Sequence, residues 1–414
     1  MQRRFAPSLL TSAGLFVGLL AAPLAAETSD SAEFAITQSP NAAQSALADR
    51  PQAVGTLGQF APAANRNDNK IDYQHWDEAL EWMVIPMGPS IREGAPRVVP
   101  TTGTRIIYGH QSRYRLEGNR IAFSFLGPDI VSALTAYRQD LERVGSELDL
   151  VRLPRNEQLA YWINLHNVAV IEALALEYPL RHPSDRKFGV NEAPLQDAKL
   201  VTIKGVSLSP RDIREGIVYA NWSDPKVMYG FWRGEIGGPS IPRLAFTGGN
   251  VDALLTWGAE EFVNSLRGLE AFNGALRVSP LYKEVENIYF TEEGALRAHL
   301  LAHARDDVKP LIDKYDRVAY NRYEGDIADM VYGKSDPGLT TVCEQGKDGI
   351  IPSQWAAQIS DTANCTFQPG VKDRAALRLI EERSRKLLKA NKRGIRTGTV
   401  IVGGDDTEAP KEVE

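Results

Sequence analysis

The sequence predicts a helix-rich α+β fold: one globular domain with a small β-hairpin or sheet, and a disulfide-closed C-terminal extension. Three observations support this prediction. The run from Asn156 to Pro179 is typical of a buried helix, short alternating segments are typical of strands, and the only two cysteines, Cys343 and Cys365, lie near the C-terminus. The chain has 414 residues, 43% of them hydrophobic, which is enough for one large domain.

Residues 1–26 have the pattern of a secretory signal peptide. Arg3 and Arg4 precede an apolar run from Leu9 to Leu24, and small residues, Ala25 and Ala26, follow it. Signal peptides combine a charged start, a short apolar core and a small-residue cleavage site. We therefore expect export by the Sec route, cleavage near Ala26, a periplasmic or secreted protein, and no further membrane-spanning segment.

The net charge of the predicted mature chain limits the kinds of molecule that it is expected to bind. Loss of the two arginines in residues 1–26 leaves 45 of the 47 Lys and Arg residues against 53 Asp and Glu, a net charge of −8. An acidic surface disfavours nonspecific binding to nucleic acids and to anionic lipids. We expect no nucleic-acid partner and a role as a cell-envelope component, while the sequence leaves the ligand and the partners unknown. It also predicts no cofactor and no bound metal.

The N-terminal part of the predicted mature chain divides into a linker and the start of the domain. Residues 27–70 are rich in Ala, Ser, Pro, Gln and Asn, which predicts a disordered linker. The globular domain is expected over 71–335, and it starts with "YQHWDEALEWMV", where apolar residues recur at helical spacing. Residues 104–126 are rich in β-branched and aromatic types around a Glu-Gly-Asn turn, so we expect a β-hairpin there. An amphipathic helix is predicted at about 128–144.

The run "NEQLAYWINLHNVAVIEALALEYP" is apolar on nearly every face, which predicts a central, buried helix. Its amides, Asn164 and Asn167, need hydrogen-bond partners, because an unsatisfied buried polar group costs about 1–3 kcal/mol. Two interpretations stay open for them: they anchor neighbouring loops, or they line the floor of a pocket. His166 is either a satisfied core histidine or a catalytic base.

Local signals define the elements that follow. "KLVTIKGVSL" alternates like a strand with Gly205 at its turn, and Ser209, Pro210 and Asp212 form a capping arrangement for a short helix over 210–220. Residues 230–242 are expected to be a glycine-rich loop. Further helices are expected at about 249–267, 292–304 and 371–393, the last one basic at its end and stopped by Gly394.

The two cysteines are predicted to form a disulfide. In an oxidising compartment an isolated pair favours a disulfide over a metal site, and closing a loop of this size stabilises the fold by roughly 3 kcal/mol. The predicted extension spans 336–393 and holds Cys343, Cys365 and the basic helix. An acidic tail, 394–414, follows it.

Four stretches carry a family resemblance: "EQLAYWINLHNVAVIEALALEYP", "VTIKGVSLSPRDIREGIV", "DPKVMYGF" and "GGPSIPRLAFTGGNVDALL". Together they resemble the domain of unknown function 547 family, found in secreted bacterial proteins and in plants, over roughly residues 115–290. The resemblance implies a compact, helix-rich domain with a small β component. It does not imply an established activity.

The sequence departs from many bacterial relatives at two positions. Met228 stands where they carry His, and Gly238 (or Ile241 in a gapped alignment) stands where they carry Cys. If relatives use these two residues as a base and a thiol nucleophile, this protein lacks both. The polar residues that it keeps are Asn164, His166, Asn167, Ser240 and Arg243.

Two other clusters have competing interpretations. His299 and His303 lie one helical turn apart, which suits a metal site or a solvated helix face, but Leu300 occupies the position of the zincin glutamate. Asp326 and Asp329 could act as paired carboxylates in glycoside chemistry or lie on an exposed face.

We therefore predict an uncharacterised extracytoplasmic protein that acts as a binding or assembly module of the envelope. Its groove is expected beside the central helix and the 233–243 loop, with Asn164, Asn167 and Arg243 as binding residues. The alternative is a hydrolase or transferase that acts on envelope material through His166 with Ser240 or a carboxylate.

Overall fold

The computed structural model of the chain describes residues 56–64, 66–97, 99, 109–334, 339–343, 365–369 and 374–395. The predicted signal peptide, most of the predicted linker and nearly all of the tail lie outside these residues. The end of that linker differs from the prediction. Thr56–Phe60 forms a short 3-10 helix, η1, and Phe60 is buried with its ring 5.3 Å from that of Trp162.

Helical residues far outnumber strand residues in the described chain, as the sequence predicts. Short 3-10 turns connect several of them: η2 (Phe123–Phe125), η3 (Leu150–Arg152), η4 (Pro183–Asp185) and η6 (Pro225–Gly230). The α-helices are α2 (Gln74–Met83), α3 (Pro128–Glu147), α4 (Arg155–Leu176), α5 (Val251–Val263), α6 (Leu281–Glu284), α7 (Glu286–Tyr289), α8 (Ala295–His303), α9 (Lys309–Lys314) and α11 (Arg374–Lys392).

The strands form four small sheets. Two antiparallel pairs join β1 (Val84–Ile85) to β2 (Arg120–Ile121) and β3 (Val201–Ile203) to β4 (Val206–Leu208). A third sheet has the order β5 (Leu269–Phe272), β6 (Ala275–Val278) and β7 (Val318–Tyr320), with β7 parallel to β6. The fourth pairs β8 (Leu339–Cys343) with β9 (Cys365–Pro369). The predicted α+β class is confirmed.

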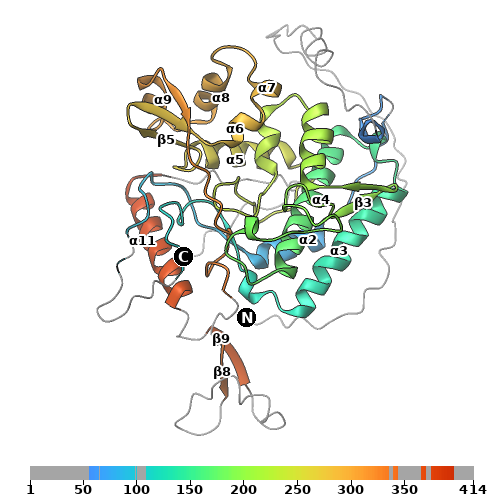
Figure 1. Cartoon of the computed structure of the whole chain (residues 1–414), viewed down its shortest axis with the longest axis horizontal. Coiled ribbons are helices and arrows are strands. Elements are labelled where there is room, and N and C mark those ends of the chain that lie inside the picture. The colour runs from blue at the N-terminus through green and yellow to red at the C-terminus, as the bar shows by residue number, and fades with distance from the viewer. Residues whose placement is uncertain are drawn as a thin grey trace, which may run out of the picture. The chain divides into compact units, whose positions relative to one another are not determined.

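Helix α4 is the centre of the hydrophobic core, with α3 packed along it and β3 beside α3 (Figure 1). Every residue from Glu157 to Ala175 is buried. By length and composition α4 could cross a membrane, contrary to the expectation that no such segment follows residues 1–26, but 94% of its most apolar window is buried inside the protein. Burial of all its faces explains the apolar sequence.

The capping arrangement after β4 is confirmed. The Asp212 carboxylate accepts from the backbone N–H and the hydroxyl of Ser209, and the Ser209 hydroxyl accepts from the N–H of Asp212. These reciprocal bonds satisfy donors at the start of the helical segment. That segment, η5 (Asp212–Tyr219), is wound as a π-helix rather than an α-helix.

The predicted hairpin over 104–126 is wrong for its described residues, 109–126. Only Arg120 and Ile121 form a strand, and they pair with Val84 and Ile85 instead of with the preceding segment. The buried guanidinium of Arg120 donates to the carbonyls of Tyr114, Arg115, Gly118 and Asn119. The preceding segment therefore curls around this cation, because its carbonyls satisfy the charge.

The C-terminal helix α11 packs against the rest of the domain. Ala375 and Leu379 are buried against Met87, Leu116 and Val331 in a second hydrophobic cluster. The carboxylate of Glu382 accepts two hydrogen bonds of 2.8 Å from Arg115, whose side chain is 1% exposed.

The predicted disulfide falls on residues whose side chains lie outside the described part of the chain. The backbone register of β8 and β9 pairs Cys343 directly with Cys365. The disulfide stays a prediction.

Candidate functional site

The asparagines of α4 fasten the loop that follows η6. Asn164 donates to the carbonyl of Phe246 at 2.7 Å and accepts from the N–H of the same residue at 3.1 Å. Asn167 donates to the carbonyl of Gly230 and accepts from the N–H of Trp232, both at 3.0 Å. Both side chains are buried, so the loop-anchoring interpretation holds. A ligand could reach these amides only if the loop opened.

His166 is held in one neutral tautomer. Its Nε2 lies 3.1 Å from the Arg214 guanidinium, which cannot accept, so Nε2 is the acceptor and Nδ1 carries the proton, donated to Asn167 Oδ1 at 3.0 Å. Burial and then the nearby Arg214 hold its pKa well below the usual range. With both ring nitrogens engaged, His166 is a poor general base.

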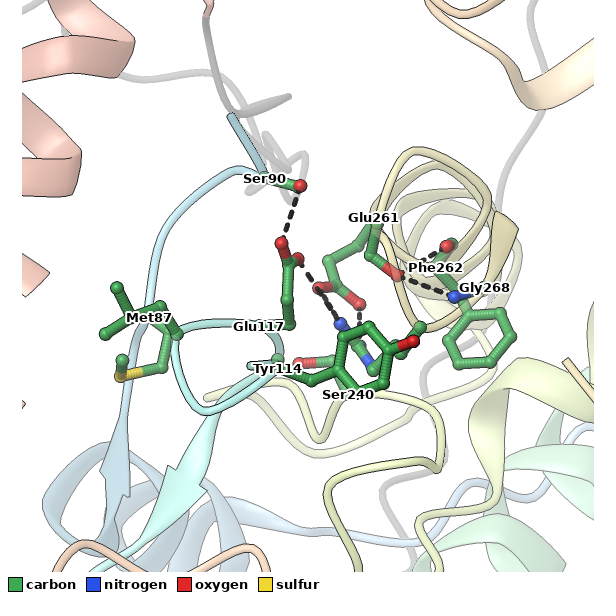
Figure 2. A network of polar contacts seen from close by, with 12 residues as sticks. Met87, Ser90, Tyr114, Glu117, Ser240, Glu261, Phe262 and Gly268 are labelled. Atoms are coloured by element: carbon green, nitrogen blue, oxygen red, sulfur yellow. Dashed lines mark hydrogen bonds and ion pairs between the residues drawn. The ribbon is translucent and has the colours of Figure 1, made fainter. Parts of the chain in front are cut away.

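Ser240 lies in a different, equally buried network (Figure 2). Its hydroxyl accepts from the N–H of Asn119 at 2.8 Å, and the amide of Asn119 donates to the carbonyl of Ile241 at 2.7 Å. In the same network, the hydroxyl of Ser90 donates to Glu117 at 2.8 Å. Among the described residues no hydrogen bond joins Ser240 to His166, and each side chain is bonded to other partners.

Arg243 also anchors the loop. It is half-exposed and donates to the carbonyl of Glu81 in α2 at 2.7 Å. Arg267, which is buried, donates to the carbonyl of Gly238 at 3.1 Å and pairs with Glu261. Side chains from several elements thus satisfy the backbone of residues 230–246, which needs partners because it is buried without regular structure.

The structure assembles a different site beside the segment after α4. A cavity of about 660 Å³ is lined by Pro179, Leu180, Arg181, His182, Asp185, Arg186, Gly333 and Lys334. This volume falls in the range of small-molecule sites. Three cations and one carboxylate give the lining two net positive charges when His182 is neutral.

His182 is the imidazole of this pocket, and Asp326 orients it. The His182 side chain is 40% exposed, and its Nδ1 lies 3.1 Å from a carboxylate oxygen of Asp326, which is itself buried. Nε2 then has no protein partner within the described ranges. The hydroxyl of Tyr332 donates to the same carboxylate oxygen at 3.3 Å, and Nδ1 of buried His110 lies 3.5 Å from the other.

Asp329 lies behind these groups and hydrogen-bonds the backbone of residues 331–333. It is fully buried and accepts from the N–H groups of Val331 and Gly333 and from the hydroxyl of Tyr178. Burial raises its pKa to about 6 despite these bonds. Gly333 has φ +66°, and a Cβ there would lie 1.8 Å from the carbonyl oxygen of Leu180, so glycine is required where the two walls meet. Asp326 and Asp329 are thus buried, and neither lies on an exposed face.

His299 of α8 is buried in the core, and His303 is half-buried beside it. Nε2 of His299 lies 2.8 Å from the hydroxyl of Tyr229, and the two imidazole rings are 4.8 Å apart. Burial is the main cause that lowers the pKa of His299 to about 3. No group of three or more His, Cys, Asp or Glu side chains in the described part of the chain is arranged to hold a metal ion.

The sequence pointed to Asp326 but missed His110, His182 and Tyr332. His110 and His182 stand alone in the sequence, with no spacing that links them to residue 326. The segments meet through backbone bonds, such as the N–H of Ile327 to the carbonyl of Arg181 at 2.8 Å. No local pattern signals such a contact.

Comparison with known proteins places the core of this architecture in a family. Residues 150–263 match the model of the family described as "Protein of unknown function, DUF547". The chain contains a DUF547 domain. The match is narrower than the 115–290 range of the expected resemblance. No curated protein and no solved structure matches the chain.

The DUF547 domain holds α4, the anchored loop and one wall of the pocket, residues 179–186. The other wall, Gly333 and Lys334, and the orienting Asp326 lie beyond the matched range. The pocket is therefore completed by chain that follows the DUF547 domain.

Proposed function

We propose that the protein binds an anionic ligand in the 179–186/333–334 pocket and does so outside the cytoplasm, as a module of the cell envelope. The observation that carries the proposal is the lining: Arg181, Arg186 and Lys334 share a cavity with a half-exposed, carboxylate-oriented imidazole. Arginine guanidinium groups match phosphate and carboxylate oxygens in geometry and charge. A ligand with a phosphate or carboxylate group fits this chemistry.

The location outside the cytoplasm rests on the N-terminal sequence. The charged start, the apolar run from Leu9 to Leu24 and the two alanines after it support export, and with it a secreted bacterial member of the family. In this setting the anionic ligand is envelope material.

Binding is tested by titrating inorganic phosphate, succinate and soluble envelope fragments into the purified protein by calorimetry. Arg186→Gln should weaken the binding of the ligand that responds by about tenfold, because a hydrogen bond to a charged group contributes about 1.5–3 kcal/mol. Arg152→Gln is the matched control. Both arginines are about half-exposed and hold one ion pair, Arg186 with Glu177 and Arg152 with Asp149, but Arg152 does not line the pocket. Equal losses in the two variants, or no binding by the wild type, would refute the proposal.

The His182–Asp326 contact supports a second candidate, hydrolysis of an anionic ester in the same pocket. The described lining residues include no Ser, Thr or Cys, so the nucleophile would be water. Nε2 of His182 would take the proton from water as the oxygen attacks, and would then deliver it to the leaving group.

Catalysis is tested with phosphate and carboxylate esters as substrates. His182→Asn should lower kcat by about a hundredfold or more, since general acid–base groups contribute 10²–10⁴-fold. Ligand affinity should change little, because the arginines hold the anion. Activity that is unchanged in His182→Asn would exclude this candidate and leave the binding proposal standing.

A further inference from the structure

Arg214 in η5 is a fully buried cation that forms no ion pair with any described residue. Its Nη1 donates to Gln196 Oε1 at 2.7 Å and faces His166 Nε2 at 3.1 Å. Both partners are neutral, and no carboxylate in the described part of the chain lies within ion-pair distance of Arg214. Its Nε and Nη2 have no acceptor there. A buried charge left in this state carries a large free-energy cost.

Two further donors without acceptors lie next to it. Nε of Arg233 and the hydroxyl of Tyr219 are buried and, within the described ranges, unpartnered. Gln196 links the two arginines, because it accepts from Arg214 and donates to the carbonyl of Arg233 at 3.3 Å. Tyr219 packs edge-on against Phe231, which in turn packs against His166.

The charges of this cluster do not balance. Arg233 is paired with Glu284 at 2.6 Å, and burial raises the pKa of Glu235, the other carboxylate near Arg233, to about 7. His166 is neutral, so Arg214 has no bonded counter-charge among the described residues. Burial first, and then the nearby Arg233, lower the pKa of Arg214 to about 9, so it remains charged at neutral pH. A single negative charge that accepts hydrogen bonds from these groups would compensate the positive charge of the cluster.

We infer that Arg214, Arg233 and Tyr219 form a buried binding site for a small monovalent anion of the size of chloride or bromide. The unpartnered nitrogens of Arg214 and Arg233 can only donate, and the Tyr219 hydroxyl can donate as well, which selects an anion over a cation. Complete burial selects a small ion, and the single uncompensated charge selects a monovalent one. The ion would fix η5 against the loop that starts at residue 230, and it is separate from the 179–186/333–334 pocket.

The test measures thermal unfolding of the full chain at constant ionic strength, with chloride, bromide or gluconate as the anion. For the wild type, each tenfold rise in halide above the dissociation constant should raise Tm by about 2 °C. Arg214→Gln should lose this dependence and, in gluconate, be no less stable than the wild type, because the uncompensated charge is gone. Arg152→Gln, on the surface, should keep the full halide response.

Tyr219→Phe provides a second variant if Arg214→Gln does not fold. It removes one donor and keeps the ring, so the halide concentration at which Tm begins to rise should increase several-fold. Crystals grown in bromide should show an anomalous peak beside the Arg214 guanidinium. A Tm that is independent of the halide, a response that is equal in the wild type and the variants, or only water beside Arg214 in the bromide crystals would overturn the inference.

Discussion

Asn167 binds three groups with one amide: the Gly230 carbonyl, the Trp232 N–H and the His166 ring. Because the site is buried, truncation leaves all three without partners, at about 1–3 kcal/mol each. We expect Asn167→Ala to lower the free energy of unfolding by about 3–5 kcal/mol in urea titrations.

The control for this prediction is Asn191→Ala. Asn191 also bridges two backbone groups, the Asp197 carbonyl and the Lys199 N–H, but it is exposed, so water can replace it. A small loss in the control beside a large loss in Asn167→Ala identifies the α4 amide as structural. A stable Asn167→Ala protein would return this residue to the list of binding candidates.

Asp329 makes stability depend on pH. Burial raises its folded pKa to about 6, above the unfolded value, so the folded state holds the proton more tightly. Its stabilising contribution is complete below about pH 4 and is lost as the pH rises through 6, by up to about 3 kcal/mol. Relative to wild type, Asp329→Asn should therefore gain stability between pH 4 and 7.

The measurement is the free energy of unfolding of both proteins at each pH. Asp306→Asn is the control, because the Asp306 side chain is 98% exposed. A wild-type-minus-variant difference that does not change with pH would show that Asp329 does not titrate in this range.

At the scale of elements, α11 is fixed to the domain by buried charge. Removing one partner of a buried ion pair costs about 3–5 kcal/mol, because the other charge is left desolvated. We expect Glu382→Ala to destabilise the protein by this amount, since Arg115 is 1% exposed. Chemical denaturation measures the loss.

The adjacent residue supplies the comparison. Glu381 pairs with Arg385 one turn away, and both are more than half-exposed, so Glu381→Ala should cost less than about 1 kcal/mol. Similar values for the two variants would mean that α11 is held by its apolar face alone. The sequence predicted the helix itself and a basic C-terminal end, but the contact with Arg115, 267 positions away, has no local signal.

At the scale of the whole molecule, a disulfide between the two cysteines would indicate an oxidising compartment. Directly opposed residues of an antiparallel pair have Cα atoms about 4.5–5.5 Å apart, within the range that a disulfide spans. The backbone register of Cys343 with Cys365 is compatible with this distance, and the disulfide stays a prediction. Non-reducing peptide mapping of the purified protein should recover the two residues in one linked peptide. Recovery of both cysteines as free, alkylated thiols would contradict the disulfide.

The elements that the sequence predicted correctly depend on residues close together in the chain. The burial of α4, the Ser209–Asp212 cap and the β3–β4 turn at Gly205 each follow from a pattern a few residues long. The hairpin predicted over 104–126 was wrong, because the buried Arg120 side chain holds the carbonyls of residues 114–119 and its strand pairs with distant Val84–Ile85, which overrides strand propensity there.

The sequence alone therefore determined the α+β class, the central helix and its need for polar partners. Only the tertiary structure decided which side chains meet: His182 with Asp326, His166 with Arg214, and Ser240 with Asn119. Periodicity and capping act over one or two turns of chain, whereas these pairs are separated by 48 positions or more. Their meeting depends on the paths of loops whose buried backbone must be satisfied by side chains from other elements.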